Sequence, residues 1–153
     1  MFKVLVIQGA NLVHLGKREP QFYGTTPREE YDRVIEAHAS AHGYEVEIVY
    51  TNVEGVAIDA IYEAHGKGLD GLLMNPAGFT YAGYALRDCV KAVALPYVEV
   101  HISHIERRGT RSVVAEAAEG VIFGFGLHSY VLGLDALLNL LQTGAANAGG
   151  ADS

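Results

Sequence analysis

Three side chains of this sequence could together remove and return protons, namely Arg18, Tyr23 and His101. A guanidinium close to a phenol stabilises the phenolate, so Arg18 and Tyr23 could form a usable base. His101 could be the paired acid, because an imidazole changes its protonation state near neutral pH. With the Asn11 amide to hold a polarised water, this set suggests proton abstraction beside a carbonyl followed by loss of hydroxide. The predicted chemistry is a dehydration that uses no metal.

Three of these residues lie in one long segment, residues 8–26, which separates an apolar run from a helix. Connections in α/β proteins are mostly ~2–6 residues long, and longer ones are usually lids, binding loops or disordered. Several apolar side chains give this segment contacts of its own, which argues against disorder: Leu12, Val13, Leu15, Phe22 and Tyr23. We therefore expect an active-site lid.

Composition and motifs exclude several classes of protein. The formal charge of −7 over 153 residues lacks the basic surface of a nucleic-acid binder. The single cysteine, Cys89, excludes an intrachain disulfide, and no apolar run approaches the ~20 residues that span a membrane. Neither a serine nucleophile elbow nor a Walker phosphate loop is present, and His101 with His104 is a weak metal pattern. Without signal-peptide regions at the N-terminus, a cytoplasmic protein is expected.

Strand-like runs alternate with helical spacing along the chain. Strands are expected at 2–7, 44–50, 69–74, 95–100 and 120–125, and helices at 27–42, 56–65, 80–94 and 129–142, with Thr26 and Thr80 as N-caps and 104–119 partly helical from Ser112. This alternation predicts an α/β fold with a parallel sheet, and five strands suit the flavodoxin-like order 2-1-3-4-5 with helices on both faces. We expect a single domain over 1–143 and a disordered tail at 144–153.

In that order the first and third strands separate at the switch point, where ligands bind outside the carboxyl ends of the strands. Three segments that follow strands would meet there, at 8–23, 75–81 and 101–111. Each begins with a polar residue directly after an apolar strand: Gln8, Asn75 and His101. One such residue alone is ordinary, but three at one crevice indicate a site.

The sequence resembles the type II 3-dehydroquinate dehydratases over about residues 4–141. QGANLVHLGKREPQFYG at 8–24 is similar to the family's lid motif N-G-P-N-L-x-x-L-G-x-R-E-P-x-x-Y-G, and NVEGVAIDAIYEA at 52–64 to N-x-E-G-x-L-I-D-x-I-H-x-A. NPAGFTYAGYALRD at 75–88 is similar to N-P-G-A-Y-T-H-T-S-V-A-L-R-D, and VEVHIS at 98–103 contains the family's E-V-H-I-S. These spaced motifs, in the right order, make the resemblance specific.

The resemblance implies a role for each catalytic residue. Tyr23 would be the base that removes a proton next to the ketone, with Arg18 stabilising its phenolate. Asn11 would position a water that stabilises the enolate. His101 would give a proton to the departing hydroxyl, oriented by Asn75.

The resemblance also implies how a carboxylated ring substrate is held and how chains assemble. The backbone amides of Ile102 and Ser103 would bind the substrate carboxylate. Asp88 would reach the site of a neighbouring subunit, because the family's enzyme is a homo-oligomer, a dodecamer built from four trimers. It uses no cofactor.

Two departures from the family pattern lie around the substrate. Tyr81 replaces the histidine of T-H-T-S, which contacts a ring hydroxyl, and the family's R-E-E-F-R is shortened to RGTR at 108–111. Arg111 is mapped to the substrate-binding arginine, with Arg108 as the alternative.

Three hypotheses follow. The first is dehydration of 3-dehydroquinate to 3-dehydroshikimate through an enolate. The second is the same elimination by a paralogous enzyme on another carboxylated hydroxy-ketone ring, which Tyr81 and the shortened loop at 104–119 keep open. The third is a non-catalytic small-molecule binding protein, against which the retained Arg18, Tyr23 and His101 argue. Flavin binding is weaker still, since the first loop lacks a phosphate cradle.

Overall fold

The computed structural model describes residues 1–17 and 19–144, and a five-stranded sheet lies at its centre. All strand pairs are parallel and follow the order β2-β1-β3-β4-β5, so the predicted flavodoxin-like order is confirmed. The strands are β1 (Lys3–Ala10), β2 (Glu45–Tyr50), β3 (Gly71–Ala77), β4 (Tyr97–His101) and β5 (Gly120–Phe123). The expected tail lies, apart from Gly144, outside the described residues, as does Arg18.

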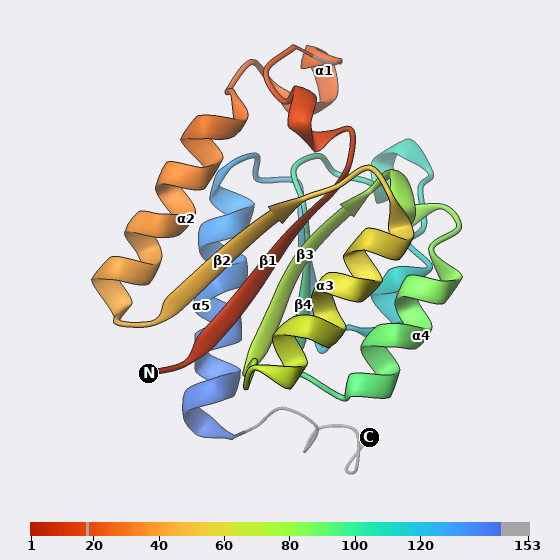
Figure 1. Ribbon diagram of the computed structural model, residues 1–153. Helices are drawn as coiled ribbons and strands as arrows, with labels where there is room; N and C mark the ends of the chain where they lie inside the picture. Colours follow the sequence, from red (N-terminus) through yellow and green to blue (C-terminus); the bar gives the residue numbers. More distant parts are fainter. Residues whose placement is uncertain (18, 145–153) are drawn as a thin grey trace.

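Helices cover both faces of the sheet (Figure 1). Helices α2 (Arg28–His42) and α5 (His128–Thr143) pack on one face, and α3 (Glu54–Gly66) and α4 (Tyr84–Val93) on the other. Each face has its own apolar core, as expected for strands that alternate their side chains between two covered faces. No described helix combines the length and the apolar composition needed to cross a membrane.

The two central strands run further than their apolar runs predict. β1 continues to Ala10 and β3 to Ala77, because the polar residues Gln8 and Asn75 pair with each other in the sheet. Gly9 permits this close pairing, since a Cβ there would lie 2.2 Å from the Pro76 carbonyl oxygen. Asn75, Pro76 and Ala77 were expected to begin the loop after the third strand, and the sheet holds them instead.

Two helices begin later than predicted. α4 starts at Tyr84, because residues 78–80 form a short 3-10 turn and the Thr80 side chain is buried instead of capping the helix. α2 starts at Arg28 with Pro27 in the extended cap position, so Thr26 is not its cap. Its predicted end is confirmed, because Gly43 follows His42 at φ 71°.

The long segment after β1 is ordered and carries two short helices, η1 (Leu12–His14) and α1 (Pro20–Tyr23). Leu12 and Leu15 are buried in the core beneath α2, which fixes the root of the segment. α1 lies above the carboxyl edge of the sheet (Figure 1). We call residues 8–26 the lid segment below.

The stretch from 104 to 119 holds two more short turns, η3 (Glu106–Arg108) and η4 (Val114–Ala117). The Ser112 hydroxyl accepts a hydrogen bond from the Ala115 amide at 3.3 Å, so the predicted partly helical region from Ser112 is confirmed.

The first strand begins and the last helix ends at the same edge of the sheet. β1 starts at the edge opposite the lid segment (Figure 1). α5 ends at that edge too, where its residues Leu137 and Leu141 lie against Gly71 at the start of β3.

Candidate active site

A cleft with a cavity volume of about 90 Å³ lies at the carboxyl edge of the sheet, where the segments after β1, β3 and β4 meet. This is the switch point predicted from the strand order. Its walls include seven of the residues selected from the sequence: Asn11, Tyr23, Asn75, Tyr81, His101, Ile102 and Ser103. The fold therefore brings most of the predicted set to one place.

The lid segment supplies one wall, with Asn11 at its root and the half-buried Tyr23 at the end of α1. Asn11 has φ 75°, a left-handed conformation that asparagine tolerates better than most residues, and its backbone N–H donates to Asn52 Oδ1 at 2.8 Å. These contacts fix where the Asn11 side chain begins, directly beyond β1.

Among the described residues, Arg108 is the one whose positive charge contacts the Tyr23 ring. It lies 4.6 Å from the centre of the Phe22 ring and 5.9 Å from that of Tyr23. Its Nε atom is buried without a hydrogen-bond partner among the described residues. A buried, unpartnered N–H of a guanidinium favours a nearby negative charge, whether a phenolate or a ligand carboxylate.

At the end of β4, His101 is held by a buried carboxylate. Its Nε2 lies 2.8 Å from Glu99 Oε2, and the Tyr97 hydroxyl donates to the other carboxylate oxygen at 2.7 Å. Glu99 is fully buried, and burial, followed by the Glu99 charge, raises the pKa of Tyr97 well above its usual value. Because a carboxylate only accepts hydrogen bonds, His101 presents Nε2–H to Glu99 and keeps Nδ1 for a ligand.

Asn75 does not make the contact expected of it. Its Nδ2 donates to the Tyr130 hydroxyl at 2.9 Å, and its Oδ1 accepts from the Ala77 amide at 3.1 Å. Tyr130 in turn donates to Gln8 Oε1 at 2.6 Å. Alternation along paired strands explains the difference, because Asn75 and Gln8 are neighbours in register on the α5 face, whereas Glu99 and His101 share the other face. In this structure Glu99 is the hydrogen-bond partner of the His101 ring.

The end of β3 is strained. Ala77 has φ 47° and ψ −117°, a conformation rare for any residue with a Cβ. The following Gly78 is required, since a Cβ there would lie 2.8 Å from the Cβ of Ala10. This bend turns the chain from the sheet into the cleft wall and places Tyr81 at the mouth, where 61% of it is exposed.

Two selected residues lie away from the cleft of their own chain. Arg111 lines a second, more open depression together with Tyr84 and Arg87, so of the two candidates it is Arg108 that lines the cleft. Asp88 lies on α4, largely exposed, and binds the Arg87 guanidinium at 2.9 Å. Among the described residues no group of three metal-ligating side chains lies at the cleft.

Sequence reasoning missed Glu99 and Tyr130. Glu99 was passed over as part of an apolar strand, although a charged residue two positions before His101 on an alternating strand shares its face. The signal for Tyr130 was weaker, because a tyrosine on the inner side of an amphipathic helix usually belongs to the apolar core.

Comparison with known proteins decides the family. The model of the dehydroquinase class II family matches residues 2–138, nearly the whole described chain. The chain belongs to this family. It is 44% identical to the 3-dehydroquinate dehydratase of Halothermothrix orenii, covering 95% of this chain and 99% of that protein. It is 43% identical to that of Caldicellulosiruptor bescii, covering 93% and 100%.

A solved structure of the same family gives the same fold. The type II dehydroquinase from Butyrivibrio crossotus superposes with a TM-score of 0.85 at 38% identity, covering 90% of this chain and 97% of that one. The resemblance drawn from four spaced motifs is thereby confirmed.

Proposed function

We propose that this chain is a 3-dehydroquinate dehydratase that eliminates water from its substrate through an enolate. The supporting observation is that Tyr23 and His101, a potential base and a potential acid, line the same cleft in a chain of this family. The relatives from Halothermothrix orenii and Caldicellulosiruptor bescii are both called 3-dehydroquinate dehydratase.

The proposed reaction moves two protons. The Tyr23 phenolate takes a proton from the carbon beside the ketone, and the electron pair moves onto the ketone oxygen as an enolate. A water held by Asn11 donates a hydrogen bond to that oxygen. As the enolate collapses, the C–O bond to the hydroxyl breaks and His101 supplies the proton with which the hydroxyl leaves as water.

Charge in the cleft supports these roles. Glu99, 2.8 Å from Nε2, stabilises the positive charge that the His101 ring carries when it holds a second proton for donation. Arg108 lies beside Tyr23 and would stabilise the phenolate together with Arg18, whose placement is outside the described residues.

The substrate carboxylate is proposed to bind the backbone amides of Ile102 and Ser103, which follow the last residue of β4 at the cleft. Asn75 would contact the hydroxyl that leaves, from a side chain held in place by Tyr130. Tyr81 would contact a ring hydroxyl at the cleft mouth. Because Arg111 lies outside the cleft, Arg108 is the better candidate for the substrate-binding arginine.

The active form is proposed to be a homo-oligomer, a dodecamer built from four trimers, in which Asp88 reaches a neighbouring cleft. The exposed position of Asp88 on α4 supports a contact outside its own chain. Light scattering on the purified protein measures the assembly. A stable monomer with full turnover would remove this role from Asp88.

Absorbance of the conjugated enone product tests the function directly. Adding 3-dehydroquinate to the purified protein should give rapid turnover that persists in the presence of a chelator. Binding of the compound without turnover would contradict the proposal and favour a related ring as substrate. Failure to bind it would favour a pocket of different specificity.

A further inference from the structure

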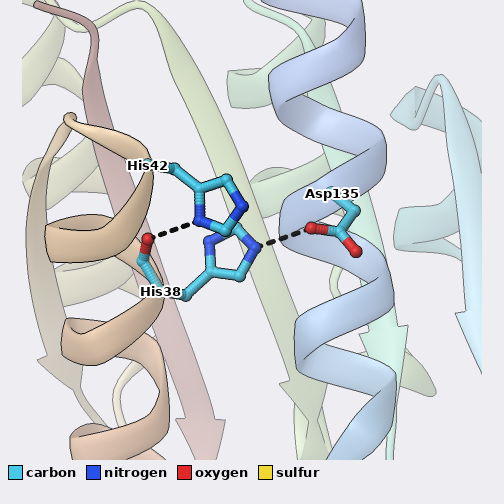
Figure 2. A group of neighbouring side chains, drawn as sticks. All are labelled: His38, His42 and Asp135. Atoms are coloured by element: carbon cyan, nitrogen blue, oxygen red, sulfur yellow. Dashed lines mark hydrogen bonds and ion pairs between the residues drawn. The ribbon is translucent and has the colours of Figure 1, made fainter.

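A cluster of potential metal ligands lies between α2 and α5, on residues that the proposed dehydration does not use. His38 and His42 are one helical turn apart on α2, and Asp135 faces them from α5 (Figure 2). One ligand atom from each lies within 4.8 Å of the other two. Two imidazoles and a carboxylate are a donor set that zinc accepts, with a water as the fourth ligand.

The hydrogen bonds of His42 leave it ready to bind a metal. Its Nδ1 lies 2.8 Å from the His38 carbonyl oxygen, which can only accept, so Nδ1 carries the proton. The neutral ring therefore has its lone pair on Nε2. Figure 2 shows this nitrogen directed, like Nε2 of His38, toward the helix that carries Asp135.

His38 has a partner on each ring nitrogen. Its Nε2 lies 2.7 Å from Asp135 Oδ1 and its Nδ1 lies 2.8 Å from the Tyr44 hydroxyl. A metal at Nε2 requires the ring proton to move to Nδ1, where the Tyr44 oxygen can accept it. Metal-binding histidines usually donate their second nitrogen to such a partner, which fixes the ring.

The ligand atoms are near one another, but zinc binding requires the two imidazole rings to rotate. Tetrahedral zinc with bonds of about 2.0–2.1 Å separates its ligand atoms by roughly 3.3 Å. The His38 and Asp135 atoms, 2.7 Å apart, would separate slightly. The two rings are stacked, with an interplanar angle of 17° and centroids 4.0 Å apart, so they would have to rotate out of this stack until one ion lies in the plane of both. His42 is exposed and Asp135 is 55% exposed, so an ion and its water can enter from solvent.

We propose that His38, His42 and Asp135 bind a divalent transition metal, with zinc as the fitting ion, and that the metal joins α2 to α5. The full-length protein, freed of metal with a chelator, is titrated with zinc chloride against a chromophoric zinc indicator. One zinc per chain should bind. His42→Ala and Asp135→Asn should each weaken binding by at least ~10-fold, since even partners of metal ligands are worth ~10–100-fold in affinity.

The matched control is His65→Ala, which removes an exposed histidine from the last turn of α3 as His42→Ala does from α2. The control should bind zinc as the unchanged protein does. Zinc should also raise the melting temperature of the unchanged protein and of His65→Ala, but not of His42→Ala. Circular dichroism without zinc checks that each variant is folded.

Either of two results would overturn the site. One is a His42→Ala variant that binds zinc as tightly as the unchanged protein, which would place the ion elsewhere. The other is an unchanged protein that does not compete with the indicator, which would leave the cluster as a histidine–aspartate contact between helices. Dehydratase activity is not part of the readout, so failure here leaves the proposed function standing.

Discussion

At the scale of single residues, the proposed chemistry depends most on the Tyr23 phenol. Tyr23→Phe keeps the ring and its contact with Phe22, at 6.5 Å between centroids, but removes the group that takes the proton. The rate of enone formation should fall by at least ~10²–10⁴-fold, the typical contribution of a positioned base. Circular dichroism should be unchanged. A loss of less than tenfold would assign proton abstraction to another residue.

The buried Glu99 gives a second prediction at this scale. Glu99→Gln keeps the shape of the side chain but removes the charge beside His101, so it should lower kcat by more than tenfold while changing KM less. Tyr97→Phe is the control, because it removes the other described hydrogen bond to Glu99 but leaves the carboxylate charged. If both variants lose the same small factor, Glu99 supports the strand and does not act through His101.

At the scale of elements, the strained end of β3 can be tested by stability. Ala77→Gly should relieve a conformation that costs ~1–3 kcal/mol, offset by the ~0.5–1 kcal/mol that glycine loses in chain entropy. The free energy of unfolding should therefore rise by about 1 kcal/mol, which raises the urea midpoint at an unchanged m-value.

Ala94→Gly is the matched control for this change. Ala94 has φ 54° at the C-terminal end of α4, away from the cleft, where glycine is the favoured residue. Ala94→Gly should stabilise the protein without affecting turnover. Ala77→Gly should also raise KM, because the bend that carries Tyr81 becomes looser. A lower midpoint for Ala77→Gly would mean that the bend is not strained.

Elements also show what could be inferred from the sequence. The number of strands followed from apolar runs alternating with helical spacing, because that signal is local. Their order followed from the fold class, because five alternating strands suit the order that the sheet shows. The ends of β1 and β3 did not, because Gln8 and Asn75 are kept in the sheet by pairing with each other. The choice between Arg108 and Arg111 depends on an irregular stretch without periodicity, so only the three-dimensional structure separates them.

At the scale of the whole molecule, buried tyrosines predict how the protein unfolds in alkali. Burial is the largest cause that raises the pKa of Tyr31 to about 12, and it also raises the pKa values of four others. These are the buried Tyr44, Tyr97 and Tyr130 and the half-buried Tyr50. The unfolded chain releases these protons near pH 10, so their contribution to stability is full below pH 10 and is lost as the pH rises toward the folded values.

Each such tyrosine costs ~1.4 kcal/mol of stability per pH unit in that window. Five together remove ~7 kcal/mol per unit, comparable to the whole stability of a typical domain of ~5–15 kcal/mol. Cooperative unfolding is therefore expected within one to two units above pH ~10. The share of the tyrosinate absorbance that comes from these five of the nine tyrosines should rise in the same step in which the far-ultraviolet circular dichroism is lost. Complete ionisation of tyrosine with the circular dichroism intact would contradict the burial of these phenols.

The placement of the first strand and the last helix has a practical consequence for attaching the protein to a label or a solid support. β1 begins, and α5 ends, at the edge of the sheet opposite the cleft. A linker, a fluorescent reporter or a resin joined to the start of β1 would extend from the far side of the molecule, leaving the mouth beside Tyr81 unobstructed. Substrate would reach a tethered copy of the chain as freely as a dissolved one.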